Sequence, residues 1–135
     1  MDVKQMNELM ERAKEARRRA YAPYSRFSVG AALLCADGET VLGCNVENAS
    51  YSPTCCAERV ALFSAISRGK RDFSAIAVVG GSGEDPQSMV TPCGVCRQVL
   101  AEFCSSDFEV LLLEESGDVR SISLGELLPL GFSLS

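Results

Sequence analysis

The sequence of 135 residues contains no histidine, and its 13 lysine and arginine residues are outnumbered by 18 aspartate and glutamate residues. With a net charge of −5 and no large basic tract, the chain lacks the electrostatic attraction on which tight binding to nucleic acid depends. No apolar run is long enough to cross a bilayer, and the first residues are charged and amphipathic rather than a secretory hydrophobic segment. We therefore expect a cytoplasmic protein whose partner is a small neutral molecule, not nucleic acid or a membrane.

Cysteine is plentiful, with seven residues, but three features argue against a disulfide scaffold. The number is odd, no export signal is visible, and a chain of this length with an apolar fraction of 47% can bury a core without cross-links. We expect residues 1–135 to form a single domain. The cysteines should then serve as metal ligands or as free thiols in the core.

Hydrophobic periodicity and turn residues predict alternating helices and strands. Asp2 and Gln5 resemble a capping box that begins the first helix, and Asp37-Gly38 supplies the tight turn of a β-hairpin. Ser123, with a glutamate three residues later, indicates a last short helix. The predicted helices cover residues 3–21, 56–67, 94–104 and a short segment after 123, and the predicted strands cover 27–35, 40–47, 73–79, 108–113 and 119–122. The main predicted loops are 21–26, 48–54 and 80–88.

This order of elements predicts an α/β fold, a three-layer α/β/α sandwich with one mixed five-stranded sheet. Right-handed crossovers would place the helices at 56–67 and 94–104 on the same face of the sheet, with their N-termini close together. The basic cluster at 17–19 falls at the end of the first helix, where cations offset the helix dipole. We expect this cluster to be a solvated helix end rather than a binding patch.

Two cysteine clusters predict a zinc site. Cys93 and Cys96 form a Cys-x-x-Cys pair at the start of a predicted helix, where a tight turn points both sulfurs at one centre. Cys56 begins the other helix and supplies a third thiolate. Three ligands leave the fourth tetrahedral position open, which distinguishes catalytic from structural zinc. Glu58 follows closely enough after Cys56 to accept a proton from water at the metal.

Three thiolates around one divalent cation carry a net negative charge, which weakens the metal as a Lewis acid. Two helix N-termini would offset part of this charge, and Arg59 could offset more by donating hydrogen bonds to ligand sulfurs. From the residues alone, Glu58 could instead be a carboxylate in the first turn of the helix, where the helix dipole favours negative charge. Arg59 has the alternative of being a surface arginine.

Four separated stretches carry a specific resemblance. They occur in this order: Tyr-Ala-Pro-Tyr-Ser-Arg-Phe-Ser-Val-Gly-Ala-Ala-Leu at 21–33, Asn-Val-Glu-Asn-Ala-Ser-Tyr at 45–51, Cys-Ala-Glu-Arg at 56–59 and Pro-Cys-Gly-Val-Cys-Arg-Gln at 92–98. Together they resemble the small, homotetrameric, zinc-dependent cytidine deaminases of pyrimidine salvage, over nearly the whole chain. The resemblance implies one Zn²⁺ per chain and a homotetramer.

The same resemblance implies hydrolytic deamination of cytidine and 2′-deoxycytidine to uridine and 2′-deoxyuridine, with release of ammonia. A zinc-bound hydroxide would attack C4 of the pyrimidine while Glu58 shuttles protons. The implied substrate contacts are Asn45 and Glu47 to the ribose 3′-hydroxyl, Phe27 against the pyrimidine, the backbone of Ala57 to the base, and Phe132 closing the pocket of a neighbouring subunit. Taken alone, Asn45 and Glu47 would be better interpreted as polar residues at a strand end, and Phe132 could equally be a packing anchor.

Other functions fit part of the pattern. A deaminase of a cytosine nucleoside antibiotic would share the metal site. A thiol-disulfide oxidoreductase could use Cys93 and Cys96, but it leaves Cys56 and Glu58 unexplained. A non-catalytic zinc module would need a fourth thiolate from Cys55 or Cys104. We instead expect the cysteines outside the zinc site to be packing residues, namely Cys35, Cys44, Cys55 and Cys104.

Overall fold

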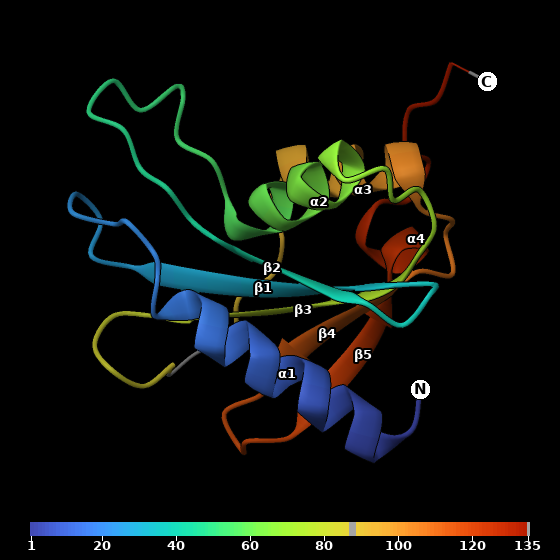
Figure 1. Ribbon diagram of the computed structural model, residues 1–135, viewed down its shortest axis with the longest axis horizontal. Helices are drawn as coiled ribbons and strands as arrows, with labels where there is room; N and C mark the ends of the chain where they lie inside the picture. Colours follow the sequence, from blue (N-terminus) through green and yellow to red (C-terminus); the bar gives the residue numbers. More distant parts are fainter. Residues whose placement is uncertain (87–88, 135) are drawn as a thin grey trace.

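The computed structural model describes residues 1–86 and 89–134, and its centre is a five-stranded sheet in the order β2-β1-β3-β4-β5 (Figure 1). The strands are β1 (Ser28–Cys35), β2 (Thr40–Cys44), β3 (Phe73–Gly81), β4 (Glu109–Leu113) and β5 (Val119–Ser123). β3 and β4 are parallel, whereas the other neighbouring pairs are antiparallel. The predicted mixed sheet is therefore confirmed, with β5 at an edge.

Helices cover both faces of the sheet and complete the three-layer α/β/α arrangement that the sequence predicts (Figure 1). α1 (Val3–Arg17) packs on one face, and α2 (Ala57–Ser67) and α3 (Gly94–Phe103) lie on the other. The short α4 (Leu124–Leu127) follows β5. Within the described part of the chain, no helix has both the length and the apolar character to cross a membrane.

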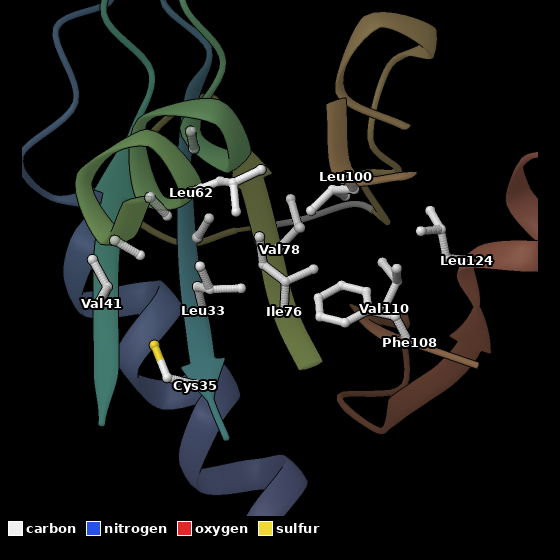
Figure 2. Close-up of a cluster of buried hydrophobic side chains, with 14 of the residues drawn as sticks. Leu33, Cys35, Val41, Leu62, Ile76, Val78, Leu100, Phe108, Val110 and Leu124 are labelled. Atoms are coloured by element: carbon white, nitrogen blue, oxygen red, sulfur yellow. The ribbon is translucent and has the colours of Figure 1, made fainter. Parts of the chain in front are cut away.

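The core consists of two apolar clusters, one on each face, because successive residues of a strand point to opposite sides. Ala32 of β1 belongs to the cluster under α1, whereas its neighbours Ala31 and Leu33 belong to the larger cluster under α2 and α3. Figure 2 shows this larger cluster, in which strand side chains meet Leu62 of α2 and Leu100 of α3. Its shared apolar surface holds the two helices on the same face.

Two glycines let the helices approach the sheet closely. A Cβ atom added at Gly43 of β2 would lie 2.4 Å from the carbonyl oxygen of Ala57 and 2.5 Å from the amide nitrogen of Ala61. A Cβ atom added at Gly30 of β1 would lie 2.1 Å from the carbonyl oxygen of Ala13 in α1. The first turn of α2 is therefore seated directly on the backbone of β2.

Element ends differ from the prediction by more than one residue at three places. α1 ends at Arg17 rather than near residue 21, and β2 ends at Cys44 rather than at residue 47. The chain beyond these ends is not irregular, because Tyr21 and Cys55 each form an isolated bridge with Val46. β3 extends to Gly81, so the predicted loop at 80–88 begins later, and its residues 87 and 88 lie outside the described part of the chain. Both predicted capping boxes, at Asp2–Gln5 and Ser123–Glu126, are present.

The predicted solvated basic cluster is wrong at Arg17. Arg18 and Arg19 are exposed, but Arg17 is only 5% exposed. Its guanidinium donates hydrogen bonds to four backbone carbonyl oxygens, those of Ser28, Gly81, Gly83 and Glu84. One buried side chain thus fastens the end of α1 to the start of β1 and to the segment after β3. All of these acceptors are carbonyl oxygens and none is a carboxylate, so hydrogen bonds alone stabilise the buried guanidinium here.

Candidate metal centre and active site

Three cysteine sulfurs converge where the N-termini of α2 and α3 meet. Cys56 is the N-cap residue of α2, Cys93 is the N-cap residue of α3, and Cys96 lies in the first turn of α3. Their Sγ atoms all lie within 4.8 Å of one another, and those of Cys56 and Cys93 are 3.8 Å apart. The three cysteines predicted as ligands are therefore brought together.

The spacing of these sulfurs fits zinc. Thiolates about 2.3 Å from a tetrahedral zinc ion are separated from one another by about 3.8 Å. In residues 1–86 and 89–134, these three are the only group of histidine, cysteine or acidic residues that could hold a metal ion. Cys55 is not part of the group, and Cys104 caps the opposite end of α3. The fit is thus to three protein ligands, not to a closed four-thiolate site.

Neighbouring residues fix the segments that carry the ligands. Cys55 pairs with Val46 through two backbone hydrogen bonds of 2.9 Å, which hold the chain just before Cys56. Arg97 donates from Nε to the carbonyl oxygen of Pro92 at 2.7 Å and from Nη1 to that of Leu127 at 2.9 Å. The sequence analysis did not predict that Arg97 holds this segment in place. Its position directly after Cys96 is the one sequence feature that could have suggested such a role.

Positive charge surrounds the sulfurs. The sulfurs stand at the N-termini of α2 and α3, where free N–H groups carry partial positive charge, and Nη2 of Arg59 lies 3.5 Å from Sγ of Cys56. The contact with Cys96, followed by the hydrogen bond from Arg59, lowers the pKa of Cys56 to about 5. The same contact with Cys56 and burial raise the pKa of Cys96. The predicted contact of Arg59 with a ligand sulfur is present in the structure.

Glu58 lies in the first turn of α2 and is only 4% exposed. Burial raises the pKa of its carboxyl to about 7, and the nearby sulfur of Cys56 adds to the rise. Cys96 also lies within reach of this carboxyl. A carboxyl whose pKa lies near neutrality is suited both to take and to give a proton beside the metal position.

Asn45 and Glu47 follow β2 rather than standing on it, and both contact the segment 24–29. The Oδ1 atom of Asn45 accepts from the amide of Val29, and its Nδ2 atom donates to the carbonyl oxygen of Phe27, both at 2.8 Å. Glu47 lines a cleft of about 390 Å³ together with Tyr24, Ser25, Tyr51 and Thr54. The rings of Tyr24 and Tyr51 meet edge to face, with centroids 6.3 Å apart.

The remaining predicted contacts occupy different surroundings. Phe27 packs over the end of β3, where a Cβ atom added at Gly80 would lie 3.0 Å from its Cε1 atom. Ala57 is fully buried in the first turn of α2. Phe132 is 69% exposed, and its carbonyl oxygen accepts a hydrogen bond of 2.9 Å from Nε2 of Gln98.

Three cysteine sulfurs placed to hold zinc beside a buried carboxyl, on an α/β/α scaffold, are typical of a zinc hydrolase. Comparison with known proteins narrows this class. Residues 3–112 match the family model for the cytidine and deoxycytidylate deaminase zinc-binding region, and the chain belongs to this family of zinc-dependent deaminases.

Individual relatives are similar to this chain over nearly its full length. The chain is 54% identical over 125 residues to cytidine deaminase of Halalkalibacterium halodurans, covering 93% of this chain and 92% of that protein. It is 50% identical over 133 residues to cytidine deaminase of Sporosarcina psychrophila, covering 98% and 93%. The crystal structure of cytidine deaminase from Burkholderia pseudomallei superposes with a TM-score of 0.84 at 54% identity, covering 93% of this chain and 97% of that one.

A relative with a different substrate in its name also matches. Blasticidin-S deaminase of Bacillus cereus is 32% identical over 130 residues, covering 93% of this chain and 91% of that protein. The scaffold of this chain is therefore similar to that of deaminases named for different substrates.

Proposed function

We propose that this enzyme deaminates cytidine and 2′-deoxycytidine to uridine and 2′-deoxyuridine, releasing ammonia, in the cytoplasmic salvage of pyrimidines. The observation that carries the proposal is the buried carboxyl of Glu58 beside the three converging sulfurs. The similarity to proteins named cytidine deaminase, at 50% and 54% identity, supports the choice of substrate.

In this proposal Cys56, Cys93 and Cys96 hold the zinc, which supplies the Lewis acidity that makes a water molecule a nucleophile at neutral pH. Glu58 accepts a proton from the attacking water and delivers it to N3 of cytosine, which makes C4 electrophilic. The water oxygen bonds to C4, and Glu58 then passes the second proton of that water to the amino group. The C4–N bond breaks, ammonia leaves, and the carbonyl of uracil remains.

The other predicted residues have roles in recognition. Arg59 offsets the negative charge of the thiolates through its contact with Cys56. Phe27 packs against the pyrimidine, and the backbone of Ala57 contacts the base. Asn45 and Glu47 recognise the ribose 3′-hydroxyl, and their fixed contacts with segment 24–29 support a preformed sugar site.

We also propose that residues 1–135 act as one catalytic domain in a homotetramer, in which Phe132 reaches the pocket of a neighbouring subunit. The exposure of apolar side chains near the C-terminal end supports this assembly: Leu130 is 102% exposed and Leu134 is 95% exposed. Sedimentation of the purified protein tests the tetramer. A monomer that retains full turnover would contradict both the assembly and the role of Phe132.

Deamination of a cytosine nucleoside antibiotic is a second candidate, because the 32% identity to blasticidin-S deaminase spans most of this chain. The higher identity to cytidine deaminases favours cytidine. A thiol-disulfide oxidoreductase is not favoured, because it gives no role to Cys56 or to the buried Glu58. A closed zinc module is not favoured either, because the sulfur cluster supplies three ligands.

The decisive experiment follows absorbance during incubation of the purified protein with cytidine, 2′-deoxycytidine, cytidine monophosphate and blasticidin S, with zinc per chain measured on the same sample. We expect turnover of both nucleosides, little or none of the nucleotide, and about one zinc per chain. Turnover of blasticidin S alone would favour the antibiotic deaminase. Zinc without turnover of any of the four compounds would contradict the proposal.

A further inference from the structure

One hydroxyl group connects two residues that the proposed function assigns to the substrate. The Oγ atom of Ser25 donates a hydrogen bond to Oε2 of Glu47 and accepts one from the backbone amide of Phe27 at 3.0 Å. Ser25 therefore lies between the carboxylate proposed to bind the sugar and the aromatic residue proposed to bind the base.

The same segment also holds the other oxygen of Glu47. Oε1 accepts hydrogen bonds from the backbone amides of Tyr24 at 2.9 Å and Ser25 at 3.1 Å. An ionised carboxylate offers about four acceptor positions. Three of them are filled by residues 24 and 25, which leaves one position, on Oε2, for a substrate hydroxyl. The hydrogen bond from the Ser25 hydroxyl and those from the two amides lower the pKa of Glu47, so this carboxylate stays ionised.

The backbone between Ser25 and Phe27 needs such support. Arg26 has φ of +57°, in the left-handed region that side chains other than glycine seldom adopt. This conformation folds the chain back so that the Phe27 amide reaches the Ser25 hydroxyl two residues earlier. A hydrogen bond from the Arg26 amide to the carbonyl oxygen of Ala22, at 3.0 Å, closes the turn.

We infer that Ser25 is a positioning residue, whose hydroxyl fixes the Glu47 carboxylate so that its one free acceptor position meets the sugar 3′-hydroxyl. The inference rests on the proposed function, because it takes Glu47 as the group that recognises the sugar. Without the Ser25 hydroxyl, Oε2 has two open positions and the carboxylate is held only through Oε1. Rotation of the carboxylate then competes with binding of the sugar, so substrate affinity falls more than the rate of the bound complex.

The test measures kcat and KM of the wild type, Ser25→Ala and Ser25→Thr with cytidine and 3′-deoxycytidine, together with melting temperature. Ser116→Ala is the matched control, because the Ser116 hydroxyl likewise donates to a carboxylate, that of Asp118 at 3.1 Å, and accepts from the amide two residues later. Ser116 lies in the turn between β4 and β5 and contacts none of the proposed site residues in these bonds.

We expect Ser25→Ala to raise KM for cytidine about tenfold, as for the loss of a hydrogen bond to a charged group, with a much smaller change in kcat. Ser25→Thr keeps the hydroxyl and should restore most of the affinity. With 3′-deoxycytidine, which lacks the hydroxyl that Glu47 binds, Ser25→Ala should change KM little. Ser116→Ala should match the wild type with both substrates.

Two results would overturn the inference while leaving the proposed function intact. One is an unchanged KM for cytidine in Ser25→Ala. The other is an equal loss with both substrates that Ser25→Thr does not restore, which would indicate a structural role in the loop. If the wild type itself fails to convert cytidine, the proposed function fails, and the inference, which rests on it, is overturned as well.

Discussion

The Nη2 atom of Arg59 lies 3.5 Å from the Sγ atom of Cys56, across the first turn of α2. The spacing of three residues places the two side chains on the same side of the helix. The Nε atom of Arg59 is buried and has no hydrogen-bond partner among the described residues. The hydrogen bond that the guanidinium donates goes from Nη2 to the sulfur of Cys56.

Replacing Arg59 by alanine should leave the thiolate cluster more anionic. We expect kcat/KM to fall about tenfold to a hundredfold, because a hydrogen bond to a charged group is lost, and zinc to dissociate more readily. Kinetic assays and zinc release to a competing chelator would measure both effects. Arg68→Ala is a suitable control, because Arg68 caps the far end of the same helix and pairs with Glu39 on the surface. Kinetics and zinc retention equal to those of the wild type would show that the helix termini alone offset the charge.

Glu58→Gln should abolish most turnover while keeping the fold and the zinc. The amide matches the carboxyl in shape but cannot carry a proton, and loss of general acid–base catalysis costs about a hundredfold or more in rate. Steady-state assays, zinc content and melting temperature on the same preparation would separate chemistry from stability. Turnover near that of the wild type would remove Glu58 from its proposed role.

Removing the metal should abolish turnover and expose thiols. After chelation, we expect additional thiols to react with a thiol reagent, because Cys56, Cys93 and Cys96 are no longer metal ligands. Cys104 should react slowly before and after, since burial raises its pKa to about 12. Addition of zinc should restore activity and raise the melting temperature. Full activity in protein shown to be free of metal would contradict the assignment.

Gly43→Ala and Gly30→Ala form a matched pair of variants. Comparing them distinguishes the effect of displacing α2, which carries Glu58, from a general loss of packing. Each adds a methyl group that would clash with helix backbone, and each should lower the free energy of unfolding by about 1–3 kcal/mol. Only Gly43→Ala displaces α2, which carries Glu58 and begins at Cys56. It should therefore also lower kcat and zinc retention per folded molecule. Equal kinetic effects of the two variants would contradict a specific role for Gly43.

Much of the fold and the metal centre could be predicted because the signals are local. Asp37-Gly38 predicts the hairpin turn, where Gly38 has φ of +92°. The Cys-x-x-Cys pair marks two ligands on one helix start. Prediction of the third ligand, Cys56, also needed the rule that right-handed crossovers place two consecutive helices on the same face of the sheet. The structure confirms this arrangement for α2 and α3.

The contacts that could not be predicted depend on partners distant in the sequence. Arg17 is bound by backbone carbonyl oxygens as far along the chain as Glu84, and backbone acceptors leave no trace in residue type. The hydrogen bond from Ser25 to Glu47 depends on the bridge between Tyr21 and Val46, which brings the two segments together. The sequence showed only a serine in a predicted loop and a glutamate at the end of a predicted strand, both of which are common.

The position of Arg17 has a consequence for how the chain tolerates change. All four of its acceptors are main-chain oxygens, so these hydrogen bonds do not depend on the side chains of Ser28 or Glu84. Substitutions in this segment that preserve the backbone path should be nearly silent. At position 17 no other residue offers a five-donor fork, so even lysine should leave carbonyl groups without a partner. The connection of α1 to these backbone segments therefore depends on the identity of a single residue, Arg17.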